Sequence, residues 1–109
     1  VHFLCARYPR EELFALTSQM NRAAVSIASN IAEGYGRDSA KELYRFLAIA
    51  QGSASELETQ LILSREFGYL TEEEFYSLAQ SVTAILKMLA ALRRRVHDQC
   101  RLCSDSQEV

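Results

Sequence analysis

Seven apolar residues repeat in steps of three and four, without a slip, toward the end of the chain: Phe75, Leu78, Val82, Ile85, Leu89, Leu92 and Val96. This spacing places one apolar side chain per turn on a single face of an α-helix. A repeat of about 3.5 residues is typical of helices that cross at a shallow angle and interdigitate their side chains. The repeat therefore predicts a helix that packs in a bundle.

Start and stop signals place the helix boundaries. Ser39–Glu42 and Thr71–Glu74 both fit the capping box, and Leu70 with Phe75 fits the hydrophobic staple beside the second box. Gly68 suits a left-handed stop between them. We therefore expect helices over residues 10–33, from residue 39 to the stop at 68, and from residue 71 onward. Residues 1–8 are expected to be the end of an earlier helix, closed by Pro9.

Short connections between long helices force neighbouring helices to pack antiparallel. The predicted fold is all-α, an antiparallel up-down four-helix bundle whose first helix is truncated because the natural start lies upstream of Val1. A hydrophobic fraction of 49% with 24% charged residues and a single proline suits one folded helical domain. We place this domain at residues 1–103 and a polar C-terminal tail, expected to fray, at 104–109.

A polar stripe marks the helix expected at residues 10–33. Its members follow steps of four, four, three and four: Arg22, Ser26, Asn30, Glu33 and Arg37. An apolar stripe of the same period runs opposite: Leu16, Met20, Ala23, Ile27 and Ile31. Gly34 and Gly36 are expected to supply the backbone freedom that ends the helix and reverses the chain.

Antiparallel packing about a turn near residue 36 predicts what the polar stripe meets. Arg22 is expected near Gly52 and Ser53, two small residues that allow close approach, and Asn30 and Glu33 are expected near Glu42 and Arg45. Charged pairs would then join the helices. We interpret the stripe as a network that fixes helix or subunit register, with a recognition surface as the alternative. The network comprises Arg22, Ser26, Asn30, Glu33, Arg37, Glu42, Arg45, Ser53, Glu56 and Gln60.

Two segments carry a resemblance to a known family. RAAVSIASNIAEGYGR at residues 22–37 and RFLAIAQGSASELETQL at residues 45–61 resemble the four-helix-bundle proteins known as 23S rRNA intervening-sequence proteins. The pattern in those bacterial proteins is RAAxSIPSNIAEGxGR followed by RFLxIAxGSxxELETQL, and the likeness extends from Tyr8 to Leu92. Ala28 stands where the family usually has proline, so no proline kink is implied here. The resemblance implies a four-helix bundle and rings of five subunits, but no biochemical activity.

No catalytic, cofactor or metal site is predicted. The carboxylates lack a nucleophile beside them, and no phosphate-binding loop, HExxH motif or serine elbow occurs. His2 and Cys5 with Cys100 and Cys103 are ligand types that zinc accepts. In an up-down bundle, however, these two pairs lie on the order of 35–40 Å apart. We therefore expect no enzyme, no bound metal or cofactor, and reduced thiols in a cytoplasmic protein. No membrane contact is expected, because no apolar run approaches the ~20 residues that span a bilayer.

Basic residues in and after the repeat are the candidate RNA contacts: Lys87, Arg93, Arg94, Arg95 and Arg101. Arginine forks suit phosphate oxygens, but cations near the end of a helix also complement its dipole. The net charge of −2 weighs against broad electrostatic binding of nucleic acid.

More apolar residues lie outside the core stripes than a monomeric bundle needs, among them Tyr44, Ile49, Leu63, Leu86 and Met88. Identical subunits are the commonest partners, and the family resemblance gives the number five. The expected function is that of a non-enzymatic, self-assembling scaffold or adaptor, a homopentamer associated with ribosomal RNA or an unidentified protein. The alternative is a nucleic-acid-binding accessory subunit of a reverse transcriptase, as in diversity-generating retroelements.

Overall fold

A computed structural model describes the backbone of residues 10–107 and the side chains of residues 10–99. Three α-helices make up this part of the chain, α1 (Arg10–Tyr35), α2 (Ala40–Glu66) and α3 (Glu72–Gln107). Residues 10–107 contain no strand, so the all-α prediction is confirmed. The helix expected at residues 1–8 lies outside the described residues, and the three helices observed do not amount to a four-helix bundle.

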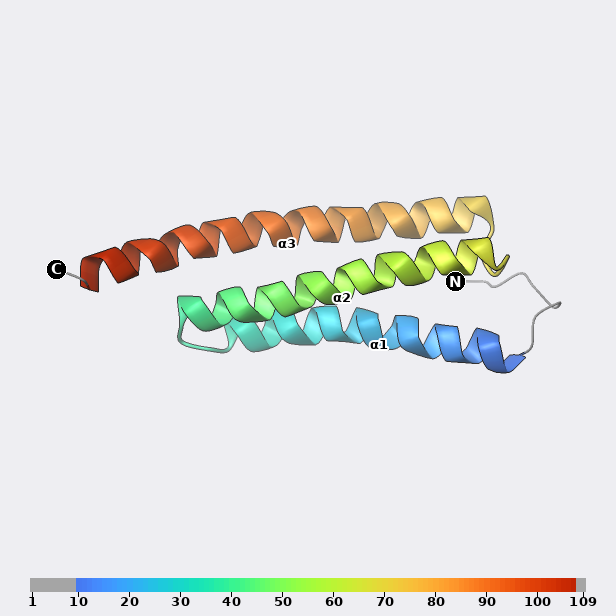
Figure 1. Ribbon diagram of the computed structural model, residues 1–109, viewed down its shortest axis with the longest axis horizontal. Coiled ribbons are helices and arrows are strands. Elements are labelled where there is room, and N and C mark those ends of the chain that lie inside the picture. Colours follow the sequence, from blue (N-terminus) through green and yellow to red (C-terminus); the bar gives the residue numbers. More distant parts are fainter. Residues whose placement is uncertain (1–9, 108–109) are drawn as a thin grey trace.

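The central helix of the arrangement is α2 (Figure 1). It packs against both α1 and α3, whereas no Cα pair between α1 and α3 comes within 8 Å in the described part of the chain. The connections at residues 36–39 and 67–71 are short, so successive helices run antiparallel as predicted. The C-terminal end of α3 extends past the turn between α1 and α2, and its helix includes residues 104–107 of the expected tail.

The hydrophobic core follows α2 in two clusters. The cluster nearer the α1–α2 turn comprises Ile27, Leu47, Ala50, Ala54, Leu89 and Val96. The cluster nearer the α2–α3 turn comprises Met20, Leu61, Leu70 and Val82. Val82, Leu89 and Val96 are buried members of the predicted repeat, and its other members pack against these clusters. The repeat of three and four is therefore the stripe by which α3 packs on α2.

The caps of α2 and α3 differ in completeness. At the start of α3, the Glu74 amide donates to Thr71 Oγ1 at 3.0 Å and the Thr71 amide donates to Glu74 Oε1 at 2.9 Å. This is the reciprocal capping box that the sequence predicts. At the start of α2, the Glu42 amide donates to Ser39 Oγ at 3.2 Å, but the Glu42 carboxylate accepts from Arg45 instead of returning to the cap. Gly68 has φ 78°, which confirms the predicted left-handed stop.

The end of α1 differs from the prediction. The helix continues past Glu33 to Tyr35, and Gly34 is a buried residue within it. Gly68 alone has a positive φ among the described residues, so neither Gly34 nor Gly36 supplies left-handed backbone. A Cβ on Gly34 would lie 2.9 Å from Phe46 Cβ and 3.0 Å from Leu43 Cδ1. Gly34 is therefore needed because α2 approaches too closely for a side chain.

One helix in the described part of the chain is long and apolar enough to cross a membrane, by length and composition alone. It is the Glu72–Gln99 segment of α3, whose most apolar window has a mean hydropathy of 1.4 and is 11% buried. A count of uninterrupted apolar runs misses this segment, because Lys87 and several uncharged polar residues divide its apolar ones. Core helices of soluble proteins share this composition, so the segment is weak evidence for a membrane span.

Candidate functional site

The polar stripe of α1 meets α2 at one pair of serines. Ser26 Oγ and Ser53 Oγ lie 2.8 Å apart and share a hydrogen bond. Asn30 Nδ2 donates to the Ser26 carbonyl at 2.8 Å and to Ser26 Oγ at 3.1 Å. The three side chains form a short polar chain between the helices, and each residue is part-buried. Such a chain fixes one relative position of the helices, because a shift along either axis breaks it.

The register of α1 on α2 differs from the expected one by about a helical turn. Ser26 faces Ser53, where Arg22 was predicted, and Arg22 instead lines a shallow polar pocket with Glu56. Helix α1 continues two residues past its predicted end, to Tyr35, and the turn occupies residues 36–39. Gly52 is exposed and a Cβ there would meet nothing within 4 Å, so its predicted role in close approach is wrong.

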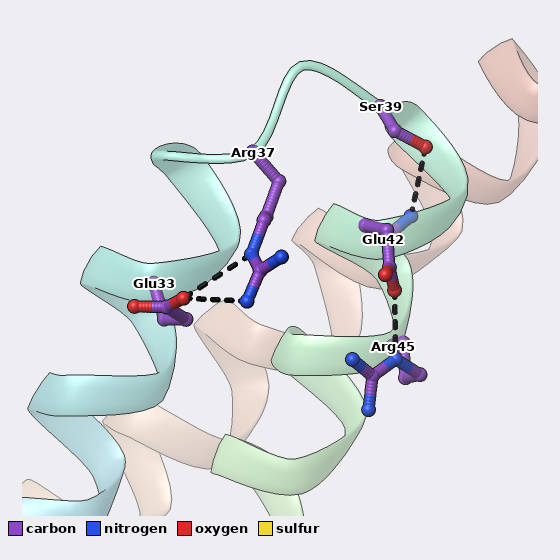
Figure 2. Close-up of polar contacts among 5 residues, drawn as sticks. All are labelled: Glu33, Arg37, Ser39, Glu42 and Arg45. Atoms are coloured by element: carbon purple, nitrogen blue, oxygen red, sulfur yellow. Dashed lines mark hydrogen bonds and ion pairs between the residues drawn. The ribbon is translucent and has the colours of Figure 1, made fainter.

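Two ion pairs flank the turn between α1 and α2 (Figure 2). Arg37 Nη2 lies 2.8 Å from Glu33 Oε1, and Arg45 Nε lies 2.7 Å from Glu42 Oε2. Both pairs join residues three or four apart in the same stretch of chain. The expected charge pairs between the helices are therefore replaced by local ones, since each glutamate has an arginine one turn away.

Phe46 lies between the two arginines beside the α1–α2 turn, Arg37 and Arg45, a region called the α1–α2 corner below. The Arg45 guanidinium carbon lies 4.5 Å from the Phe46 ring centroid and that of Arg37 lies 5.3 Å from it. Both distances are within the range of cation–π attraction. Gly34 provides the space beside Phe46. The sequence contained a signal for this contact, because Gly34 continues the apolar stripe of α1 after Ile27 and Ile31.

The pKa of Glu42 is lowered from its ordinary value of 4.5, chiefly by the hydrogen bond from Arg45 and further by the charges of nearby cations. The pKa of Arg45 is raised by the same hydrogen bond. A general acid at neutral pH needs the opposite change in a carboxyl group. The Glu42–Arg45 pair therefore has the electrostatics of a structural ion pair.

Glu56 and Gln60 continue the polar line along α2. Gln60 Nε2 donates to Glu56 Oε1 at 3.4 Å, and Gln60 is buried, with 4% of its surface exposed. Its Oε1 atom is buried and has no hydrogen-bond partner in the described part of the chain. A buried acceptor without a partner costs roughly 1–3 kcal/mol. The polar groups at this end of the stripe are thus less completely hydrogen-bonded than those of the serine pair.

The predicted basic cluster divides into two kinds of residue. Arg93 is part-buried against α2, where Nη1 donates to Gln51 Oε1 and Nη2 donates to the Tyr44 hydroxyl at 3.1 Å. Its guanidinium carbon also lies 4.8 Å from the Tyr44 ring centroid. Lys87, Arg94 and Arg95 are exposed. Arg101 lies on α3, beyond the described side chains.

Tyr44 and Gln51 are polar partners of α3 that were not among the predicted site residues. They lie seven residues apart on α2, so they share one helical face, and that spacing was the available signal. With Arg93, Arg94, His97 and Asp98 they line a groove between α2 and α3.

Metal-ligating side chains do not gather in groups of three or more within the described residues. The zinc arrangement considered from the sequence rests on His2, Cys5, Cys100 and Cys103, whose side chains all lie outside that part. What the described side chains offer chemically is hydrogen bonding, ion pairing and contact with anions.

The described part of the chain defines an all-α protein of antiparallel helices, with a polar stripe at one helix pair and an arginine-bearing groove at the other. Residues 1–91 match the family described as 23S rRNA-intervening sequence protein. The chain belongs to this family. No curated protein matches the chain.

Proposed function

We propose that the protein is a non-enzymatic, self-assembling helical scaffold or adaptor. The observation that carries this proposal is that α1 and α3 both pack on α2 while their Cα atoms come no closer than 8 Å to each other in the described part of the chain. Helices of an isolated bundle would normally cover one another's apolar faces. An arrangement of this kind leaves apolar surface for a partner.

Large exposed apolar side chains support the proposal. Phe14, Val25 and Tyr35 on α1 are 74%, 63% and 57% exposed, and Tyr76 and Met88 on α3 are 65% and 49% exposed. Apolar surface of this extent marks an interaction site. Lipid is a weaker explanation than protein, because α3 already packs a buried stripe against α2.

Further copies of the chain are the proposed partner, and five is the proposed number of subunits. Closed symmetric assemblies of identical subunits are the commonest oligomers. The number five rests on the resemblance to intervening-sequence proteins. A four-helix bundle belongs to the same proposal, since a further helix would cover part of the same surface.

Light scattering at micromolar concentration tests the proposal. The expected mass is about five times the 12.3 kDa of the chain. Met88→Glu is expected to lower the mass, whereas Lys87→Gln, an adjacent exposed substitution with the same change in charge, is expected to leave it unchanged. A native protein that stays monomeric would overturn the proposal.

We also propose that the protein has no enzymatic activity. The carboxylates of Glu33 and Glu42 at the α1–α2 turn are exposed, and each forms an ion pair with an arginine. The pKa of Glu42 is lowered, not raised. Neither feature suits acid or base catalysis.

RNA contact is a second candidate function, favoured by the exposure of Lys87, Arg94 and Arg95 on α3. Binding of ribosomal RNA, or service as an accessory subunit of a reverse transcriptase, would use this basic surface. Purely electrostatic binding would weaken with salt and would lose comparable affinity on removal of either Arg94 or Arg95. RNA affinity that does not change with salt would remove this candidate.

A further inference from the structure

A groove of about 420 Å³ lies between α2 and the second half of α3. Its lining comprises Tyr44, Gln51, Ala90, Arg93, Arg94, His97 and Asp98, and α1 contributes nothing to it. The volume falls within the range of small-molecule sites and is far larger than a phosphate ion needs. The groove therefore suits a ligand that has an uncharged part of some size as well as a charged group.

The floor of the groove is held in place by Arg93. Its hydrogen bonds to Gln51 and Tyr44 and its position over the Tyr44 ring fix the guanidinium against α2. Only two of its five N–H donors are used by these bonds, and Nε is buried without a partner in the described part of the chain. The Tyr44 hydroxyl accepts from Arg93, so its own proton remains to be donated to a ligand.

Aromatic rings form one wall. The centroids of the Tyr44 and His97 rings lie 5.7 Å apart, and the ring planes are tilted by 49°. His97 is exposed, so its ring can receive a planar group, and every nucleic-acid base has a face that stacks on such a ring. The wall therefore favours a ligand with a flat aromatic body.

The charge at the groove favours an anion. Arg94 is exposed at its edge and makes no hydrogen bond or ion pair among the described residues, so its guanidinium is free to bind. Asp98 is the one acid in the lining, and its Oδ1 atom lies 3.8 Å from His97 Nδ1. Two guanidinium groups against one carboxylate leave the lining positive.

We propose that this groove binds a phosphorylated nucleoside, with the base against Tyr44 and His97 and the phosphate on Arg94. Arg93 is a positioning residue that holds Tyr44. The nucleotide has two sources, free in solution or as one residue of a single RNA strand. This proposal does not depend on self-assembly, because every lining residue comes from α2 and α3 of one chain.

The direct test is titration of the native protein with adenosine monophosphate, followed by NMR and calorimetry. Arg94→Gln and Tyr44→Leu are each expected to weaken binding at least about fivefold, at the lower end of what a stacked base or a charged contact contributes. Arg95→Gln is the matched control, an exposed arginine adjacent on α3 but outside the lining, and should change affinity less than about twofold. Tyr44→Phe keeps the ring but loses the hydroxyl that contacts Arg93 and the ligand, so it should weaken binding less than Tyr44→Leu does, which guards against a folding defect in the leucine variant.

Competition distinguishes the two sources. A short oligoadenylate that displaces adenosine monophosphate and binds more tightly would identify the strand, whereas an oligoadenylate that fails to displace it would identify the free nucleotide. Inorganic phosphate should compete poorly with either. The proposal is overturned if adenosine monophosphate does not bind at millimolar concentration, if inorganic phosphate competes equally well, or if Arg94→Gln and Arg95→Gln weaken binding to the same extent. None of these results bears on the mass of the assembly.

Discussion

Ser26 on α1 and Ser53 on α2 join their helices through a hydrogen bond of 2.8 Å between the two Oγ atoms. The pair sets the register of the first helix hairpin, and Asn30 supports it by donating to Ser26 Oγ at 3.1 Å. Both hydroxyls are small, so the bond forms only where the helices approach closely. The pair thus reports the relative position of α1 and α2.

A double-mutant cycle of Ser26→Ala and Ser53→Ala is expected to give a coupling free energy of about 0.5–1 kcal/mol. Each single substitution also gains helix propensity of roughly 0.5 kcal/mol, so the single changes in stability will be small. The gain in propensity cancels in the cycle, which leaves the interaction itself. Urea unfolding at one fixed protein concentration measures it. Strictly additive effects would show that the hydroxyls do not interact in solution.

Two glycine substitutions are expected to change stability in opposite directions. Gly34→Ala should destabilise the protein by about 1–3 kcal/mol, because the new Cβ would lie 2.9 Å from Phe46 Cβ, an atom fixed to the α2 backbone. Gly52→Ala should stabilise it by roughly 0.5–1 kcal/mol, because α2 gains helix propensity and nothing lies within 4 Å of the new atom. Thermal unfolding of both variants checks the signs. Equal effects of one sign would contradict the close approach at Gly34.

Sequence periodicity predicted the helices because it depends on local physics. The apolar repeat on α3, the Thr71–Glu74 box and the stop at Gly68 each involve a few residues within one element or its end. Whether these local structures form does not depend on where the other helices lie. The antiparallel order of α1, α2 and α3 follows from the short connections in the same way.

Contacts between helices were harder to predict. The predicted register of α1 on α2 is wrong by about a helical turn, because the pairing depends on the length and path of the turn between them, which local periodicity does not determine. Glu33 and Glu42 at the α1–α2 turn form ion pairs with arginines close in sequence, and residue spacing alone does not predict which arginine each one contacts. Arg93 was grouped with exposed arginines because burial depends on the neighbouring helix, which supplies Gln51 and Tyr44.

Acid is expected to weaken the α1–α2 corner through Glu42. Its pKa in the folded protein is lowered from 4.5, so the folded state binds a proton there less readily than the unfolded chain does. The stability from the Glu42–Arg45 pair is therefore fully present above the ordinary pKa and is lost as the pH falls through the lowered one.

NMR titration of the Glu42 side-chain carboxyl carbon measures this pKa directly. Arg45→Gln should raise the pKa toward its ordinary value, because the hydrogen bond from Arg45 is the largest cause of the change. Lys41→Gln serves as the control, since Lys41 is the smallest contributor and should move the pKa least. A larger response to Lys41→Gln than to Arg45→Gln would show that the ion pair does not form in solution.

Arg93 is expected to stabilise the packing of α3 on α2, unlike its neighbours. Arg93→Ala removes the hydrogen bonds to Gln51 and Tyr44 and the cation–π contact, and should cost about 1–3 kcal/mol of unfolding free energy. Arg95→Ala, at an exposed position of the same helix, should change stability by less than about 0.5 kcal/mol. Arg93→Lys should recover only part of the loss, because an ammonium group cannot reproduce the planar fork that reaches both partners. Urea unfolding of the three variants at one concentration tests this order, and an Arg93→Ala variant as stable as Arg95→Ala would mean that Arg93 is free at the surface.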